Sequence, residues 1–345
     1  MYAFISSIRS YFFDNGIFKS SEFDLPIINV GNLAVGGSGK TPHIEYIIRL
    51  LKEEFNVATL SRGYGRKTKG YREVNVESTA EECGDEPLQI KQKFPNIRVF
   101  VGENRVEAIT KLLFDYPNID VILLDDAYQH RAIKAGLNIL LTDFSKIFTR
   151  DKSMPLGRLR EYPAAARRSD LVIVTKCNPD ISENKKMELS SEISNFTSAE
   201  TLFSSIKYSD LKAFNSIKNT EEINNILLIS ALANPKPMFD YLENKYSPKR
   251  IEHIEFRDHY YFSDKDIFNF IQKFNSFAER NKIIVISEKD AARLRVSTKG
   301  TAFEKLPVFI LPIEVSFIAN SNQIFNEKII NYVRENKADY NIHQK

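Results

Sequence analysis

The glycine-rich stretch at residues 34–41 constrains the fold of this chain more than any other feature. It reads AVGGSGKT, follows a short β-branched run at residues 27–30, and precedes apolar residues spaced along one face of a helix up to Leu51. Pro42 suits the first turn of that helix, where its missing N–H is not needed. A strand, a glycine-rich loop, Lys-Thr and a helix are the parts of a phosphate-binding loop, or P-loop. The stretch therefore predicts a nucleoside triphosphate site.

The residue types of the loop predict how it would hold ATP and Mg²⁺. Glycines allow backbone N–H groups to point at phosphate oxygens. Lys40 would reach the β- and γ-phosphates, and the Thr41 hydroxyl would bind Mg²⁺. The alternative is a glycine-rich turn before an ordinary helix. The predicted nucleotide-binding residues are Ala34, which stands where the usual pattern has its first glycine, Val35, Gly36, Gly37, Ser38, Gly39, Lys40 and Thr41.

A second acidic motif supports the nucleotide site. Residues 121–124 form a continuous apolar run, as a strand buried on both faces requires. Asp125 and Asp126 follow it in the manner of a Walker B site and are predicted to bind Mg²⁺. The alternative is that these acids cap a helix. Gln129 and His130 come directly afterwards in a dense polar cluster.

Two further segments carry charged residues whose role the local pattern leaves open. A basic, glycine-containing loop at residues 61–72 includes Arg62 and Tyr64, and such a loop can bind phosphates or be a solvated surface. Asp85 and Glu86 precede a proline, so they either begin a helix or supply a base and a metal contact; alone, the motif favours the helix start. The predicted substrate contacts are Asn32, Arg62, Tyr64, Arg105, Gln129 and His130.

The order of predicted elements indicates an α/β chain with two units. Strands at residues 57–60, 98–101, 138–142 and 171–175 alternate with helices, which indicates a doubly wound parallel sheet of P-loop kinase type. Four more strands, at 226–230, 251–256, 282–287 and 308–311, predict a second, smaller α/β unit. We therefore expect an N-terminal helix at 1–20, a P-loop domain at 21–205 and a smaller domain at 206–345.

Composition and the N-terminal segment bear on location. The net charge of +3 is small for 345 residues, which argues against a nucleic-acid partner. Two cysteines without paired spacing, no secretory signal and no membrane span predict a cytoplasmic protein. The first 20 residues form an aromatic amphipathic helix that either lies at a membrane surface or packs on the protein's own core. Its predicted membrane-facing residues are Tyr2, Phe4, Ile8 and Phe12.

Eight motifs occur in order along nearly the whole chain: VGNLAVGGSGKTP, SRGYGR, GDEP, LLDDAYQHR, MPLGRLRE, ALANP, FRDHYYF and SEKDA. In this order they resemble one family, the tetraacyldisaccharide 4'-kinases of the lipid A pathway of Gram-negative bacteria. Residues 127 and 128 depart from the pattern, because Ala-Tyr stands where the family usually has Gly-Phe.

The resemblance implies transfer of the ATP γ-phosphate to the 4'-hydroxyl of a tetraacylated glucosamine disaccharide 1-phosphate, forming lipid IVA at the inner-membrane surface. It implies an active-site cleft between two α/β domains. It also implies that Asp85 is the catalytic base, assisted by His259, and that Lys40 and Arg160 offset phosphate charge. Mg²⁺ would be bound by Thr41, Glu86, Asp125 and Asp126. We expect a monomer that associates peripherally with the membrane.

Two rival functions are weighed against this prediction. A GTPase-like switch would need Asp-x-x-Gly after the Walker B strand and Asn-Lys-x-Asp for guanine, whereas this chain has Asp125-Asp126-Ala127-Tyr128 and Thr175-Lys176-Cys177-Asn178. A kinase of a soluble sugar or nucleotide would have no evident use for the aromatic N-terminal helix.

Overall fold

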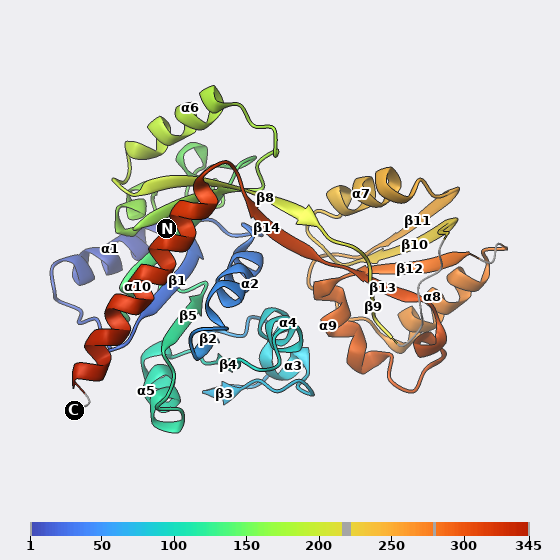
Figure 1. The fold of residues 1–345 in the computed structure, drawn as a ribbon, viewed down its shortest axis with the longest axis horizontal. Coiled ribbons are helices and arrows are strands. Elements are labelled where there is room, and N and C mark those ends of the chain that lie inside the picture. Colours follow the sequence, from blue (N-terminus) through green and yellow to red (C-terminus); the bar gives the residue numbers. More distant parts are fainter. Residues whose placement is uncertain (1, 216–221, 279–280, 344–345) are drawn as a thin grey trace.

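The P-loop strand β1 (Ile27–Asn32) lies inside a nine-stranded sheet in the computed structural model, which describes residues 2–215, 222–278 and 281–343 (Figure 1). The strand order is β14-β8-β7-β6-β1-β5-β2-β4-β3. β1 pairs in parallel with β5 and β6, and antiparallel pairing is confined to the two edges, β14 with β8 and β3 with β4. The other strands are β2 (Val57–Ser61), β3 (Arg72–Glu73), β4 (Arg98–Val101), β5 (Val121–Asp125), β6 (Leu137–Asp143), β7 (Leu171–Thr175), β8 (Glu200–Tyr208) and β14 (Ile313–Phe317).

Helices cover this sheet and confirm the predicted α/β class. The P-loop helix packs its apolar face, which includes Ile44, Ile47 and Leu51, against the buried sides of β1 and β5. The helices of this unit are α1 (Tyr2–Asp14), α2 (Lys40–Leu51), α3 (Ala80–Cys83), α4 (Asp85–Lys93), α5 (Arg105–Asp115), α6 (Glu183–Ser194) and α10 (Ser321–His343), with short 3₁₀ turns at Phe148–Arg150 and Pro163–Arg168.

A second sheet of five strands, in the order β11-β10-β12-β13-β9, forms the smaller unit. Its strands pair in parallel except β9, which runs antiparallel to β13. β8 and β14 form the two-stranded connection between the units (Figure 1). The elements of this unit are β9 (Lys212–Ala213), β10 (Asn225–Ser230), α7 (Lys236–Tyr246), β11 (Arg250–Glu255), α8 (Asp264–Asn275), β12 (Lys282–Ser287), α9 (Glu288–Ser297), a 3₁₀ turn at Ala302–Lys305 and β13 (Val308–Leu311).

The C-terminal helix differs from the expected division of the chain. We expected residues 206–345 to form one smaller domain, but β14 returns to the first sheet and α10 packs on it. Phe325, Ile329 and Val333 of α10 are fully buried in the same apolar cluster as Val30 of β1. The expected boundary after residue 205 also falls inside β8. Local periodicity predicts that a helix forms, but it does not predict which sheet that helix covers.

The part of the chain that the structure describes contains no helix that is both long enough and apolar enough to cross a bilayer.

Candidate active site

The predicted P-loop connects the carboxyl end of β1 to the start of α2. Gly36 and Gly39 adopt left-handed backbone angles, with φ of 111° and 84°. A Cβ at Gly36 or Gly37 would meet nothing within 4 Å, so the loop is open on that side. The Ser38 hydroxyl is buried and has no hydrogen-bond partner within the described residues. An open glycine loop at the start of a helix, with an unsatisfied hydroxyl, is suited to binding phosphate.

The P-loop backbone makes hydrogen bonds to the loop that contains Arg158 and to the end of β7. The Val35 N–H donates to the Arg158 carbonyl at 2.9 Å, and the Thr175 hydroxyl donates to the Ser38 carbonyl at 2.9 Å. Lys176 at the end of β7 donates to the Gly37 carbonyl and forms an ion pair with Asp143 at 2.9 Å. These contacts fix the loop before any ligand binds.

Lys40 and Arg160 both contact Asp126 beside the loop. The Arg160 guanidinium makes a bidentate pair with the Asp126 carboxylate at 2.7 and 3.2 Å and donates to Asn32 Oδ1 at 2.6 Å. Lys40 Nζ lies 3.7 Å from Asp126 and 3.5 Å from Asn32 Oδ1. Burial opposes ionisation of Asp126, but these two cations lower its pKa below the ordinary value. The structure thus gathers four predicted site residues, with Asp126 held ionised by cations.

Asp125 differs from Asp126 in the direction of its pKa shift. It is fully buried, and its Oδ1 has no hydrogen-bond partner among the described residues. Burial, together with the nearby Glu86 carboxylate, raises the pKa of Asp125 to about 8. Lys40 and Arg105 lower this pKa only in part, so two neighbouring carboxylates with incomplete charge compensation are a donor set suited to a bound cation. The described residues hold no ready-made cluster of three or more His, Cys, Asp or Glu ligands. Mg²⁺ does not require one, because it keeps water and substrate phosphates as ligands.

Asp85 lies at one of the contacts between the first unit and the second. It is the first residue of α4, and its Oδ2 lies 3.0 Å from His259 Nδ1 and 2.6 Å from Arg293 Nη2. Burial would raise the pKa of Asp85, but hydrogen bonds from His259 and Arg293 lower it to about 2. His259 has a left-handed φ of 58°, rare for a residue with a side chain, and its ring contacts Tyr64 edge-on. The predicted Asp85–His259 pair is therefore present in the geometry.

Several of the predicted substrate contacts lie beyond the carboxyl ends of the strands, as the P-loop does. Arg105 is buried at the start of α5 and donates to the Gly102 carbonyl at 2.5 Å. Burial and the nearby positive charge of Arg62 lower the pKa of Arg105 to about 10. Burial and the positive charges of Arg105, Arg9 and Arg62 lower the pKa of His130 to about 4. This imidazole is therefore neutral at pH 7. Tyr64 is 73% exposed, which leaves its ring available to a ligand.

Most of the basic residues that flank the site are already paired. In the loop after β2, three of the cations pair with Glu103, Glu81 and Glu82. In the short 3₁₀ turn before β7, Arg167 pairs with Asp14 and Arg168 pairs with Glu161. These paired cations are less available to bind phosphates than the basic loop at residues 61–72 suggests from its sequence. Arg62, exposed beside Arg105, is the residue that fits that role best.

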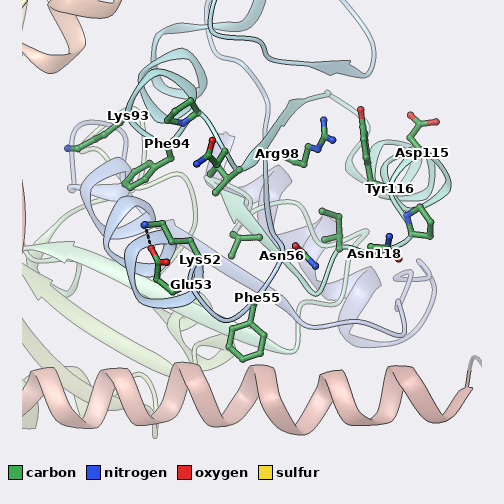
Figure 2. A pocket seen from close by; sticks show the side chains of 16 residues that line it. Lys52, Glu53, Phe55, Asn56, Lys93, Phe94, Arg98, Asp115, Tyr116 and Asn118 are labelled. Carbon is green, nitrogen blue, oxygen red and sulfur yellow. Dashed lines mark hydrogen bonds and ion pairs between the residues drawn. The ribbon is translucent and has the colours of Figure 1, made fainter.

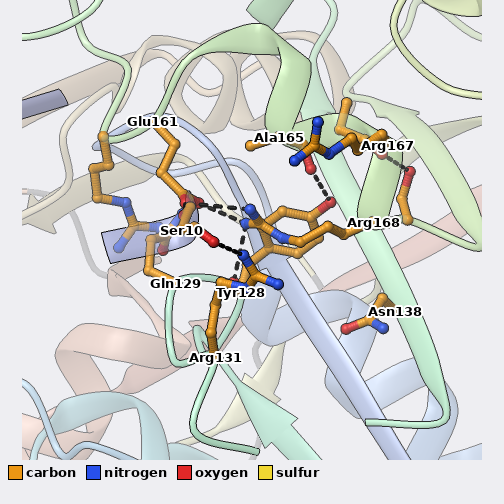
Figure 3. A network of polar contacts seen from close by, with 12 residues as sticks. Ser10, Tyr128, Gln129, Arg131, Asn138, Glu161, Ala165, Arg167 and Arg168 are labelled. Carbon is orange, nitrogen blue, oxygen red and sulfur yellow. Dashed lines mark hydrogen bonds and ion pairs between the residues drawn. The ribbon is translucent and has the colours of Figure 1, made fainter. Parts of the chain in front are cut away.

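A polar network lies beneath Gln129 and joins α1 to this region (Figure 3). Glu161 is buried and receives bonds from Arg168 at 2.7 Å, Ser10 at 3.1 Å and Gln129 at 3.3 Å. Gln129 also donates to the Asn32 carbonyl at 2.9 Å. Next to Gln129, the buried Tyr128 hydroxyl donates to the Ala165 carbonyl at 2.9 Å. The hydroxyl that this chain has in place of the family's usual phenylalanine therefore has a hydrogen-bond partner within the protein.

A hollow lies at the opposite, amino ends of strands β2, β4 and β5 (Figure 2). Its lining includes Val57 and Arg98, which begin β2 and β4, and Ile119, which precedes β5. Ligands in open α/β sheets bind at the carboxyl ends of the strands, where the P-loop lies. This hollow is therefore not part of the candidate site.

Sequence reasoning did not identify Arg293 or Glu161 as site residues. Arg293 stands three residues after Asp290 in the stretch EKDAAR. The spacing places both on one face of α9, where they pair at 3.2 Å. That signal shows a local pair, but not that Asp85 from another unit completes it.

Comparisons with known proteins agree with this geometry. The family model described as tetraacyldisaccharide-1-P 4'-kinase matches residues 1–334. The chain is 43% identical over 343 residues to the tetraacyldisaccharide 4'-kinase of Bacteroides fragilis (strain YCH46), covering 96% of this chain and 90% of that protein. It is 43% identical over 340 residues to that of Flavobacterium johnsoniae, covering 97% and 95%.

A solved structure gives the same result at the level of the fold. The crystal structure of LpxK from Aquifex aeolicus in complex with ATP matches with a TM-score of 0.71 and 27% identity, covering 96% of each chain. With a family match over nearly the entire sequence and relatives above 40% identity, this chain belongs to the tetraacyldisaccharide-1-phosphate 4'-kinase family.

Proposed function

We propose that this kinase transfers the γ-phosphate of ATP to the 4'-hydroxyl of a tetraacyldisaccharide 1-phosphate, the step that forms lipid IVA, with Asp85 as the base. The acceptor oxygen forms a bond to the γ-phosphorus while the bond from that phosphorus to the β-phosphate oxygen breaks. ADP leaves, and the hydroxyl proton passes to Asp85. The observation that carries this proposal is the 3.0 Å contact between His259 and Asp85, which joins the two units.

The weak basicity of Asp85 is compatible with this role. A carboxylate with a pKa of about 2 is ionised at every physiological pH, so it is always ready to accept a proton. Phosphoryl transfer through a loose transition state depends mainly on positioning and charge compensation rather than on base strength. Asp85 would orient the hydroxyl for in-line attack and take its proton late, and His259 would hold the carboxylate and share the charge.

The cations around Asp126 supply charge compensation. When ATP binds, Lys40 and Arg160 would exchange contacts with Asp126 for phosphate oxygens, because a triphosphate carries more negative charge than one carboxylate. Both side chains are 12–18% exposed, so their fields are little screened. Asp126 keeps them in place until then.

The acidic residues near these cations are suited to Mg²⁺. Asp125, Glu86 and the Thr41 hydroxyl would hold it, because Asp125 Oδ1 is buried without a partner and Glu86 is close enough to raise the pKa of Asp125. Asp126 is a weaker candidate than the sequence predicts, since Arg160 occupies both of its oxygens. When bound, the ion would offset the charge that develops on the phosphate oxygens.

The acceptor lipid requires the protein to reach a membrane surface. We propose peripheral association with the cytoplasmic face of the inner membrane through α1. This helix packs on the protein at one side, with Arg131 donating to the Ser10 carbonyl at 2.7 Å, and exposes Ile8 and Tyr11 at the other. The side chains of Tyr2 and Phe4, also predicted to face the membrane, lie outside the described residues.

The reaction is tested by following γ-³²P from ATP into tetraacyldisaccharide 1-phosphate in detergent micelles. The expected result is a phosphorylated lipid whose formation requires both the enzyme and Mg²⁺. An acyl-free disaccharide serves as the comparison acceptor. Equal transfer to the acyl-free acceptor would contradict the lipid assignment, and ATP hydrolysis without transfer would contradict the kinase reaction.

A further inference from the structure

Arg293 is a buried arginine of the second unit whose guanidinium contacts the proposed base in the first. It lies on α9 and its side chain is 1% exposed. Arg293 Nη2 donates to Asp85 Oδ2 at 2.6 Å, a short charge-assisted bond. The same nitrogen lies 3.5 Å from His259 Nδ1. Arg293, His259 and Asp85 therefore form one compact group.

The two oxygens of Asp85 are in different situations. Oδ2 accepts from both Arg293 and His259, whereas Oδ1 is buried and has no partner among the described residues. A carboxylate that accepts two bonds on one oxygen cannot rotate without losing both. The pairing therefore determines which oxygen remains free and where it points.

The guanidinium is itself fixed from its own side. Arg293 Nη1 pairs with Asp290 at 3.2 Å and lies 3.4 Å from the Ala231 carbonyl. Asp290 in turn accepts from the Ser287 hydroxyl at 2.6 Å and from the Ala231 N–H at 3.2 Å. Arg293 thus rests on the start of α9 and the end of β10, which are rigid elements of the second unit.

A second ion pair fixes α4 relative to α9. Lys93 at the last residue of α4 pairs with Glu288 at the first residue of α9 at 2.6 Å. The two helices thus run antiparallel, with one charged contact at each end of α4. This pair prevents α4 from sliding, so Asp85 keeps its position along the helix axis.

We infer that Arg293 is a positioning residue that holds Oδ2 of Asp85 and leaves Oδ1 as the oxygen that receives the proton of the acceptor hydroxyl. The inference rests on the proposed role of Asp85 as the base. In the transfer step, the proton of the 4'-hydroxyl goes to Oδ1 while Arg293 keeps its bond to Oδ2. Arg293 acts through Asp85 and contacts neither ATP nor the acceptor.

The test compares the steady-state transfer of γ-³²P from ATP to the lipid acceptor in four variants: Arg293→Lys, Arg293→Met, Asp85→Asn, and the double variant of Asp85→Asn with Arg293→Met. A displaced reactive group costs on the order of 10²-fold in rate. We expect Arg293→Met to lose that much in kcat while its KM for ATP changes less than twofold. Arg293→Lys keeps a cation and is expected to recover part of the loss.

The double variant separates positioning from folding. Without the carboxylate there is nothing for Arg293 to orient, so the double variant is expected to be no slower than Asp85→Asn alone. It also removes both charges, which avoids leaving one buried and unpaired. The matched control is Arg295→Met on the same helix, because the Arg295 guanidinium lies over the Phe214 ring rather than near Asp85. It should retain the wild-type kcat. Thermal melting of every variant checks that the protein is folded.

The outcomes distinguish this inference from the function on which it rests. A folded Arg293→Met with wild-type kcat, beside an inactive Asp85→Asn, overturns the role of Arg293 and leaves the base in place. An equal additional loss in the Asp85→Asn background also overturns it, because the effect would then not pass through Asp85. Wild-type kcat in Asp85→Asn would overturn the base and the positioning residue together.

Discussion

Two adjacent aspartates at the end of β5 have opposite electrostatic surroundings. Asp126 faces Lys40 and Arg160 and stays ionised, whereas Asp125 is fully buried near Glu86 and has a pKa of about 8. Sequence alone assigns both residues to the metal. The structure separates them because backbone geometry at Asp126, with φ of 51°, turns its carboxylate toward the cations.

The pKa of Asp125 leads to a prediction for stability. Its folded-state pKa lies above the ordinary value of 3.8, so between about pH 4 and pH 8 the unfolded chain binds fewer protons than the native protein. This group therefore destabilises the ligand-free protein progressively as pH rises through that range. Asp125→Asn should be more stable than wild type at pH 8, and the difference should shrink toward pH 4.

Thermal melting at pH 5, 6.5 and 8 without nucleotide measures this difference. Ser145→Ala, on the exposed turn beyond β6, is a control whose stability difference should not follow this pH course. A constant difference between Asp125→Asn and wild type across the three pH values would show that Asp125 is ionised in the ligand-free protein.

At the level of elements, α1 illustrates how one helix serves two contacts. Its inner side is held by ion pairs of Asp14 with Arg131 and Arg167, and its outer side exposes Ile8 at 40% and Tyr11 at 60%. The sequence left packing and membrane contact as alternatives. The structure shows packing, and the exposed residues leave membrane contact as a compatible proposal.

Replacing the exposed residues while keeping the packed ones tests that proposal. The double substitution Ile8→Ser with Tyr11→Ser should reduce binding to anionic liposomes and raise KM for the lipid acceptor, because apolar area for the interface is lost. The kcat at saturating micellar substrate should change little. Phe268→Ser, on the exposed side of α8 in the second unit, is the control. Liposome sedimentation equal to wild type would exclude this surface.

Elements with a local signal could be predicted, and contacts between distant elements could not. The strand, the glycine loop and the start of α2 were predictable because backbone conformation there follows from nearby residues. Arg293 reaches Asp85 across 208 positions, and α10 returns to a sheet formed by the first part of the chain. Local periodicity and residue spacing do not predict contacts between residues so far apart in the sequence. His259 was predicted as the partner of Asp85 only through the family resemblance.

At the scale of the whole molecule, α4 links the P-loop helix to the second unit. Glu45 of α2 is fully buried and pairs with Lys93 of α4 at 2.6 Å, and Lys93 also pairs with Glu288 of α9. Burial raises the pKa of Glu45, and Lys93 opposes that effect. A single ammonium group thus joins three helices that carry parts of the site.

Removing that ammonium group should destabilise the protein as a whole. Lys93→Met removes the cation that pairs with both Glu45 and Glu288, and it leaves Glu45 only the longer 3.9 Å contact with Arg49. Losing one partner of a buried ion pair costs about 3–5 kcal/mol. We expect a clear loss in the free energy of urea unfolding. Adding Glu45→Gln should restore part of it, because the buried charge disappears. An unchanged stability in Lys93→Met would mean that solvent screens this contact.

Lys40 at the start of α2 and Asp85 at the start of α4 are proposed to act in one site on one reaction. The direct measurement compares wild type, Lys40→Ala and Asp85→Asn in single-turnover γ-³²P transfer to tetraacyldisaccharide 1-phosphate, with ATP binding measured in parallel. Both variants should lose about 10²–10⁴-fold in transfer rate. ATP binding should weaken in Lys40→Ala and persist in Asp85→Asn. Transfer at the wild-type rate by a folded Asp85→Asn would contradict the proposed site.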